Sequence, residues 1–241
     1  MALSEPEPSE HASPEAESEV ARSLPNPSIL ALTVGSTIGF LGLAALGWGG
    51  WNPLVFDPAR AWACGVVGVA AFASLFTGIN LGGCVRADSR GWWILFPVAG
   101  TILAFAWLAS YADRRGLGTI GGEAIRHVGL GLLAIGGALR VGPMFLLGPR
   151  FTWPLASQTG HRLLTSGLYR RIRHPSYAGG LLGMAGWSLV FRSGIGLGLT
   201  LLVIPAIVSV IREEEELLMV EHGAAYAEYR RRTWRLLPFV Y

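Results

Sequence analysis

The chain has 241 residues, of which 51% are hydrophobic and only 15% are charged, whereas about 25% are charged in an ordinary soluble domain. Its formal net charge is +3, its sequence pI is about 9.2 and its mean hydropathy is +0.45. These values exclude an ordinary soluble enzyme and predict a single domain that lies largely within a lipid bilayer. The basic residues stand beside apolar runs, so no nucleic-acid partner is expected, because a nucleic-acid-binding protein gathers such residues on a water-exposed face.

Residues 1–27 differ in composition from the rest of the chain. They contain six Glu and one Arg and are rich in Pro, Ser and Ala. Such a segment cannot bury enough apolar surface to offset the entropy of ordering, so it is predicted to be a disordered acidic tail. It does not have the pattern of a signal peptide, because the charge ahead of the first apolar run is acidic.

Residues 28–124 are predicted to form N-terminal transmembrane helices. They contain three runs free of charged residues, at 29–52, 61–85 and 91–112. Each run reaches the ~20 residues that a helix needs to cross ~30 Å of hydrocarbon. Three such runs in so short a chain favour membrane insertion over a set of buried core helices.

Residues 125–241 continue the apolar pattern with more interruptions. A fourth apolar segment at 127–149 contains Arg140, and the uncharged stretches 178–191 and 193–211 meet at an Arg-Ser-Gly step. The last two stretches predict a tight helical hairpin. The expected fold class is therefore all-α, a polytopic membrane protein with five or six transmembrane helices and a C-terminal helical hairpin.

The arginine distribution predicts the orientation of these helices. Arginines are concentrated in the stretch 150–175 and in the C-terminal tail. The helical hairpin between these two stretches would place both on the same side of the membrane. The positive-inside rule places that side in the cytoplasm, and Arg114, Arg115 and Arg126 would then lie on the opposite side. Because the chain contains no lysine, we expect a GC-rich bacterial genome and a location in the bacterial inner membrane.

Residues 161–180 combine side chains that a membrane anchor does not require. Arginines such as Arg162 and Arg173 provide planar donors for a carboxylate or a phosphate, and His174 can donate or accept a proton near neutral pH. Gly179 and Gly180 permit close approach of a backbone to a ligand. The alternative is a basic loop that binds anionic lipid headgroups.

Four consecutive glutamates, at 213–216, directly follow the last apolar run. On a helix they point in different directions, so only one or two of them can face a site. Arg212 precedes Glu215 and Glu216 by three and four residues, close enough for a local ion pair. The alternative is a solvated helix that continues beyond the lipid.

No metal site is expected, because no pair of His or Cys has metal-ligand spacing. Cys64 and Cys84 lie within or beside an apolar run and are interpreted as small apolar packing residues. The signatures of hydrolases, P-loop NTPases and Rossmann enzymes do not occur in the sequence.

Four spaced motifs follow one another in the last 80 residues. They are L-x-T-S-G-x-Y-x-x-x-R-H-P-x-Y-x-G at 163–179, R-x-E-E-x-x-L at 212–218, G-x-x-Y-x-x-Y at 223–229 and L-P-F at 237–239. In this order they resemble the isoprenylcysteine carboxyl methyltransferase and phospholipid methyltransferase family of integral membrane enzymes. The resemblance covers residues 125–241, which are therefore expected to form a methyltransferase-like membrane domain, and it departs from the usual pattern at Leu168, Ser176 and His222.

The family uses S-adenosylmethionine, so the resemblance implies that cofactor, in a cleft that faces the cytoplasm. The catalytic residues carried over by position are Arg212, Glu214 and Glu215, with Arg212 orienting the acceptor. The implied cofactor-binding residues are His161, Arg162, Leu163, Leu164, Tyr169, Arg173, His174, Pro175, Ser176, Tyr177 and Gly179.

The methyl acceptor is left open as a lipid-like or small molecule with a carboxylate, thiol or amine. A carboxylate acceptor needs no general base, whereas an amine or thiol would need one, and Glu214, Glu215 and His174 are the candidates. Two other interpretations stay open: an NADPH-dependent membrane reductase of the sterol reductase type, and a channel, transporter or scaffold without enzymatic activity. Stabilisation by S-adenosylhomocysteine but not by NADPH would favour the methyltransferase over the reductase.

Overall fold

The structure is a computed structural model that describes residues 27–76, 90–147, 163 and 165–238. The described helices of the N-terminal part are α2 (Pro27–Trp48), α3 (Trp51–Val55), α4 (Pro58–Ser74) and α6 (Arg90–Arg115). They are followed by α7 (Ala124–Leu147), the short 3-10 helix η2 (Gly167–Arg170), α8 (Pro175–Val190), α9 (Gly194–His222) and α10 (Ala224–Arg232). Within these residues the β structure is limited to two isolated bridges, so the all-α prediction is confirmed. Cys84 and almost all of the predicted acidic tail lie outside the described residues.

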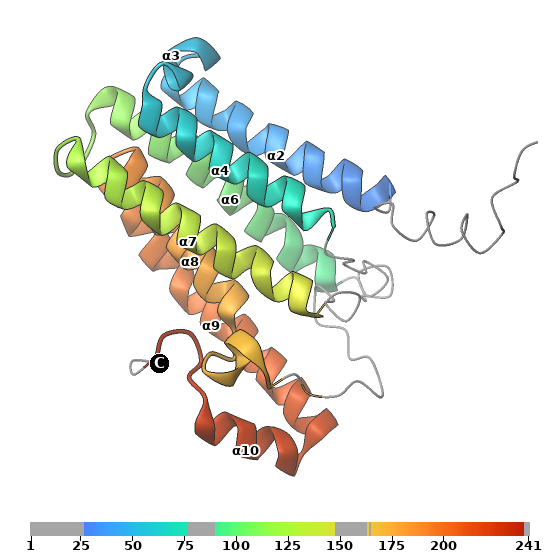
Figure 1. The fold of residues 1–241 in the computed structure, drawn as a ribbon. Helices are drawn as coiled ribbons and strands as arrows, with labels where there is room; N and C mark the ends of the chain where they lie inside the picture. Colours follow the sequence, from blue (N-terminus) through green and yellow to red (C-terminus); the bar gives the residue numbers. More distant parts are fainter. Residues whose placement is uncertain (1–26, 77–89, 148–162, 164, 239–241) are drawn as a thin grey trace, which may run out of the picture.

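The long helices lie side by side in one bundle (Figure 1). α9 extends past the bundle at one end, where η2, α10 and the C-terminal segment gather around it (Figure 1). The turn between α8 and α9 lies at the other end. There Ser193 begins α9 by accepting a hydrogen bond from the Gly196 amide at 3.0 Å, so the predicted hairpin forms at the expected step.

Three of the described helices are long and apolar enough to cross a membrane: Leu30–Trp48, Ala124–Pro143 and Gly194–His222. α4 has only 17 residues and ends at Ser74, well before the end of the uncharged run at residue 85. Asp57 fixes its start by accepting a hydrogen bond from the Arg60 amide, and a helix of this length spans about 25 Å. The total of five or six crossings stays a prediction.

Glycines allow α7 and α8 to pack backbone against backbone. A Cβ added at Gly129, Gly136, Gly179 or Gly186 would lie only 2.4–2.6 Å from a backbone nitrogen of the other helix. Small residues permit such close approach between membrane helices. Gly179 therefore has a packing function, which the sequence did not distinguish from an approach to a ligand.

A buried ionic cluster connects the helices at the end of the bundle that carries the α8–α9 turn. Its centre is Asp113 of α6, whose side chain is only 1% exposed. Arg60 of α4, Arg126 of α7 and Arg192 of the turn approach its carboxylate within 3.5, 3.3 and 3.5 Å. Arg192 and Arg126 also pair with Glu123. Arg126, expected as a flanking charge, is thus buried and paired.

Replacing Asp113 with Asn should destabilise the protein strongly, because three guanidinium groups would lose their shared counter-charge. Removing one partner of a buried ion pair costs about 3–5 kcal/mol, which corresponds to a decrease in Tm of about 6 °C or more for a chain of this size. Thermal unfolding in detergent measures the change.

Glu228→Gln is the matched control, because Glu228 pairs with Arg231 and Arg232 through a half-exposed side chain. Such surface pairs contribute about 1 kcal/mol at most. Equal Tm values for the two variants would contradict the central role of Asp113.

Candidate active site

Three segments meet where α9 leaves the bundle: the chain just before α8, the glutamate run of α9, and the C-terminal segment. The Arg173 amide donates to the Trp234 carbonyl and the Trp234 amide donates to the Arg171 carbonyl, both at 2.8 Å. The His174 amide donates to the Arg235 carbonyl at 3.1 Å. This short parallel pairing holds the Arg173–His174 step against the C-terminal segment.

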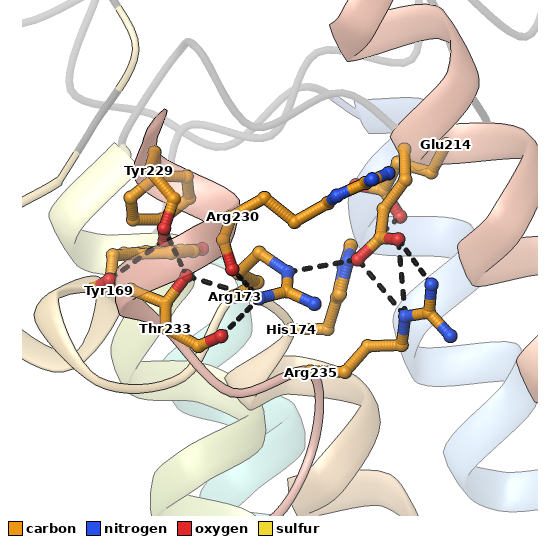
Figure 2. Close-up of polar contacts among 9 residues, drawn as sticks. Tyr169, Arg173, His174, Glu214, Tyr229, Arg230, Thr233 and Arg235 are labelled. Atoms are coloured by element: carbon orange, nitrogen blue, oxygen red, sulfur yellow. Dashed lines mark hydrogen bonds and ion pairs between the residues drawn. The ribbon is translucent and has the colours of Figure 1, made fainter. Parts of the chain in front are cut away.

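Glu215 is the centre of the side-chain contacts at this point. It is 4% exposed and accepts from Arg173 Nε at 2.9 Å and from Arg235 Nη2 at 2.7 Å. His174 Nε2 lies 3.3 Å from the same carboxylate, and Figure 2 shows the side chains of Arg173, His174 and Arg235 close to one another. Charge-assisted hydrogen bonds of this kind are about twice as strong as neutral ones, so one carboxylate connects all three segments.

Arg173 also holds the end of α10. Its Nη1 donates to the Arg230 carbonyl at 3.1 Å and to both oxygens of Thr233. A cation beside the last carbonyls of a helix is favourable because those groups carry partial negative charge. The Tyr229 hydroxyl donates to the Tyr169 carbonyl at 2.7 Å (Figure 2), and burial raises the pKa of Tyr229 to about 12, so this donor keeps its proton at neutral pH.

Glu214 differs from Glu215 in its surroundings. His174 Nδ1 lies 3.6 Å from Glu214 Oε2, which is too long for a hydrogen bond, and within the described residues that oxygen accepts none. The Tyr177 hydroxyl donates to the Glu214 carboxylate, and the Glu214 side chain is 33% exposed. Glu214 Oε2 is therefore a buried carboxylate oxygen without a hydrogen-bond partner in the described residues, beside an imidazole and a phenol.

The structure brings several of the predicted site residues together. These are Tyr169, Arg173, His174, Tyr177, Glu214 and Glu215, whereas Pro175 begins α8 and Ser176 accepts a hydrogen bond from Arg140 of α7. His161, Arg162 and Leu164 lie outside the described residues, and the half-buried Leu163 precedes η2.

The predicted residue Arg212 lies apart from this cluster. Its side chain is exposed, and it pairs with no described carboxylate. The local pair with Glu215 does not form, because Glu215 points toward Arg173 and Arg235 instead. The catalytic assignment of Arg212 stays a prediction.

Sequence reasoning missed the C-terminal segment as part of the site. Arg235 binds Glu215, and Leu236 is 6% exposed and packs in a cluster with Ala178 and Ile211. The available signal was the glutamate run itself, because a carboxylate buried at the end of an apolar helix requires a cation.

Comparison with known proteins gives matches in the C-terminal half. Residues 125–225 match the family described as phospholipid methyltransferase. The human protein-S-isoprenylcysteine O-methyltransferase is 33% identical over 115 residues, 46% of this chain and 40% of the human protein. The Schizosaccharomyces pombe enzyme of the same name is 32% identical, over 46% of this chain and 48% of that protein. Protein-S-isoprenylcysteine O-methyltransferase B of Arabidopsis thaliana is 30% identical, over 48% of this chain and 60% of that protein.

These matches confirm the resemblance that the motifs indicated, and the chain spans between 40% and 60% of the length of these three relatives. A solved structure of a eukaryotic intramembrane Ras methyltransferase, isoprenylcysteine carboxyl methyltransferase, has a TM-score of 0.52 and 22% identity to this chain. The similarity covers 83% of this chain and 74% of that one, and it is a similarity of fold. Together with the three apolar helices, it makes this chain a multi-pass integral membrane protein.

Replacing Glu215 with Gln should release the C-terminal segment from α9, because Arg173 and Arg235 would lose their shared carboxylate. We expect hydrogen exchange of the Arg173, His174 and Trp234 amides to become at least about tenfold faster, since local opening sets that rate. Amide exchange followed by mass spectrometry measures it, with Glu216→Gln as the control at an exposed position of the same run. Unchanged exchange at these three amides would show that the carboxylate does not hold the segment.

Proposed function

We propose that this membrane protein, whose residues 125–225 match the phospholipid methyltransferase family, transfers a methyl group from S-adenosylmethionine to a lipid-like or small acceptor. The observation that carries the proposal is the paired arrangement of Glu214 and Glu215 around His174. It lies at the end of apolar helices, where a charged cofactor from water and an apolar acceptor from lipid can both arrive. The chain spans only part of its relatives, so their substrates do not define the acceptor here.

The residues of the site fit the cofactor's charges. S-adenosylmethionine supplies an electrophilic methyl group on a sulfonium, and it also carries an ammonium group and ribose hydroxyls. Glu214 Oε2 is buried and accepts no hydrogen bond in the described residues, and it would accept one from one of these donors. His174 and Tyr177 stand beside it with their rings 5.9 Å apart and would restrict the orientation of the bound molecule.

The main contribution of the protein to such a reaction is alignment. Methyl transfer is an in-line displacement, and holding two reactants in line is worth ~7–11 kcal/mol. Glu215, with its bonds to Arg173 and Arg235, would keep His174 and Glu214 in place. Arg212 would orient the acceptor from the exposed side of α9. We propose that this end of the bundle faces the cytoplasm of a bacterium, as the arginine distribution predicts.

Replacing Glu214 with Gln should weaken S-adenosylhomocysteine binding by about 10- to 100-fold, because a hydrogen bond to a charged group contributes about 1.5–3 kcal/mol. Thermal-shift titration of the purified protein measures this affinity, since a ligand that binds only the folded state raises its stability. Glu213→Gln, at the neighbouring exposed position, should bind as the unaltered protein does.

The activity itself is tested with S-adenosylmethionine labelled in its methyl group. Native membranes that contain the protein should give a labelled product that partitions with lipids or small organic molecules, and Glu214→Gln should give much less of it. Stabilisation by NADPH with none by S-adenosylhomocysteine would instead support a membrane reductase and contradict the proposal.

A further inference from the structure

The C-terminal segment returns to the level at which the apolar part of α9 ends. α9 is a candidate membrane span, and its first charged residue is Arg212, so the boundary between lipid and water lies near Ile211. Leu236 packs in one cluster with Ile211 and Ala178, together with the partly buried Ile207. The residues on either side of Leu236 in the chain therefore lie at the height of the lipid headgroups.

Two large apolar side chains beside Leu236 are exposed at this height. Trp234 is 40% exposed and Leu237 is 48% exposed. The Trp234 backbone is held in place, because its amide donates to the Arg171 carbonyl and its carbonyl accepts from the Arg173 amide, both at 2.8 Å. Tryptophan is enriched at the membrane–water interface, since its ring is apolar and its N–H is polar. Both side chains therefore suit the headgroup layer of a bilayer.

Four exposed arginines stand close to this apolar pair. Arg170 ends η2 and Arg171 follows it, and both are exposed. Arg231 and Arg232 lie in the last turn of α10, with side chains that are 79% and 76% exposed. These four residues are called the arginine surface below. Figure 1 shows η2, α10 and the C-terminal segment on the same part of the molecule, around the end of α9.

The arginine surface carries excess positive charge. The Tyr229 hydroxyl of α10 donates to the Tyr169 carbonyl of η2 (Figure 2), which keeps the two helices together. Residues 167–171 and 224–232 contain five arginines and one carboxylate, that of Glu228, so their net charge is +4. Glu228 is shared between two arginines of the surface, at 3.5 and 2.5 Å. The exposed Glu213 and Glu216 are turned about 160° and 100° around α9 from the glutamate that contacts the C-terminal segment, and so lie away from this surface.

We propose that the arginine surface binds the phosphates of anionic phospholipids in the leaflet at which α9 leaves the bundle, with Trp234 and Leu237 among the headgroups. A guanidinium group binds a phosphate through two parallel hydrogen bonds, and a basic segment beside an anionic leaflet is attracted to it. The helix bundle already holds the surface at the lipid boundary. The lipid contact does not depend on the proposed function.

The lipid contact acts on the candidate active site, because the segment that carries Trp234 also carries Arg235. Arg235 pairs with Glu215, and the His174 amide donates to the Arg235 carbonyl. Lipid bound on the outer side of the segment adds to these contacts and holds the segment against α9. The charge of the surrounding leaflet therefore sets how often the segment opens.

Amide hydrogen exchange in nanodiscs tests the proposal. Exchange of the Arg173, His174 and Trp234 amides should become at least about threefold slower when phosphatidylglycerol replaces part of the phosphatidylcholine, because a ligand of the closed segment makes opening rarer. The difference should disappear at about 1 M salt, where the screening length is about 3 Å. Equal exchange in the two lipids, or a difference that persists at high salt, would overturn the proposal.

Charge-removing variants locate the effect. Arg231→Gln combined with Arg232→Gln should remove most of the difference between the lipids, whereas the two Lys replacements, which keep the charge, should retain part of it. Arg114→Gln combined with Arg115→Gln is the matched control, because it also removes two exposed arginines but at the opposite end of the bundle. Equal losses in the control and in the α10 variant would show that the total charge, and not this surface, determines the response.

Two further measurements identify what the surface binds. Native mass spectrometry of protein from mixed micelles should show phosphatidylglycerol retained at least about threefold over phosphatidylcholine, and equal retention would contradict the proposal. If inorganic phosphate slows exchange in phosphatidylcholine nanodiscs as much as phosphatidylglycerol does, the surface binds the free anion and the proposal is wrong. These measurements use no S-adenosylmethionine, so failure of the lipid contact leaves the methyltransferase assignment intact, and failure of methyl transfer leaves the lipid contact intact.

Discussion

The arrangement at the site depends on one buried carboxylate, that of Glu215. A carboxylate that is 4% exposed at the end of an apolar helix is stable only when cations and hydrogen-bond donors surround it. Arg173 comes from the segment before α8 and Arg235 from the C-terminal segment, so pairing one carboxylate brings together parts of the chain far apart in sequence. The Glu215 carboxylate also contacts His174, and the His174 ring in turn lies beside Glu214.

At each end of the bundle, a buried carboxylate connects several segments of the chain through ion pairs with arginines. At one end Asp113 connects α4, α6, α7 and the α8–α9 turn. At the other end Glu215 is surrounded in a similar way, but its neighbour Glu214 keeps an oxygen without a hydrogen-bond partner in the described residues. Asp113 Oδ1 and the Nε atoms of Arg60 and Arg192 likewise form no hydrogen bond in the described residues, so the two clusters differ in the segments that they connect.

The sequence predicted the elements formed by strong local signals. The uncharged runs predicted α2, α6, α7 and the α8–α9 hairpin, and the helical spacing of the glutamates predicted that only one or two of them face a site. The partner of Glu215 was not predictable in this way. A local pair with Arg212 lies on an exposed helix face and contributes only tenths of a kcal/mol, so the buried contacts with Arg173 and Arg235 prevail, and their formation depends on the tertiary fold.

The apolar cavity of about 180 Å³ between the helices and the glutamate cluster around His174 are built by different parts of the chain. The family match covers residues 125–225 and includes His174, Glu214 and Glu215, whereas Phe40, Val67 and Phe105 of the cavity wall lie before it. Substitutions in α2, α4 and α6 can therefore change the shape of the cavity without altering the contacts of Glu214, Glu215 and His174.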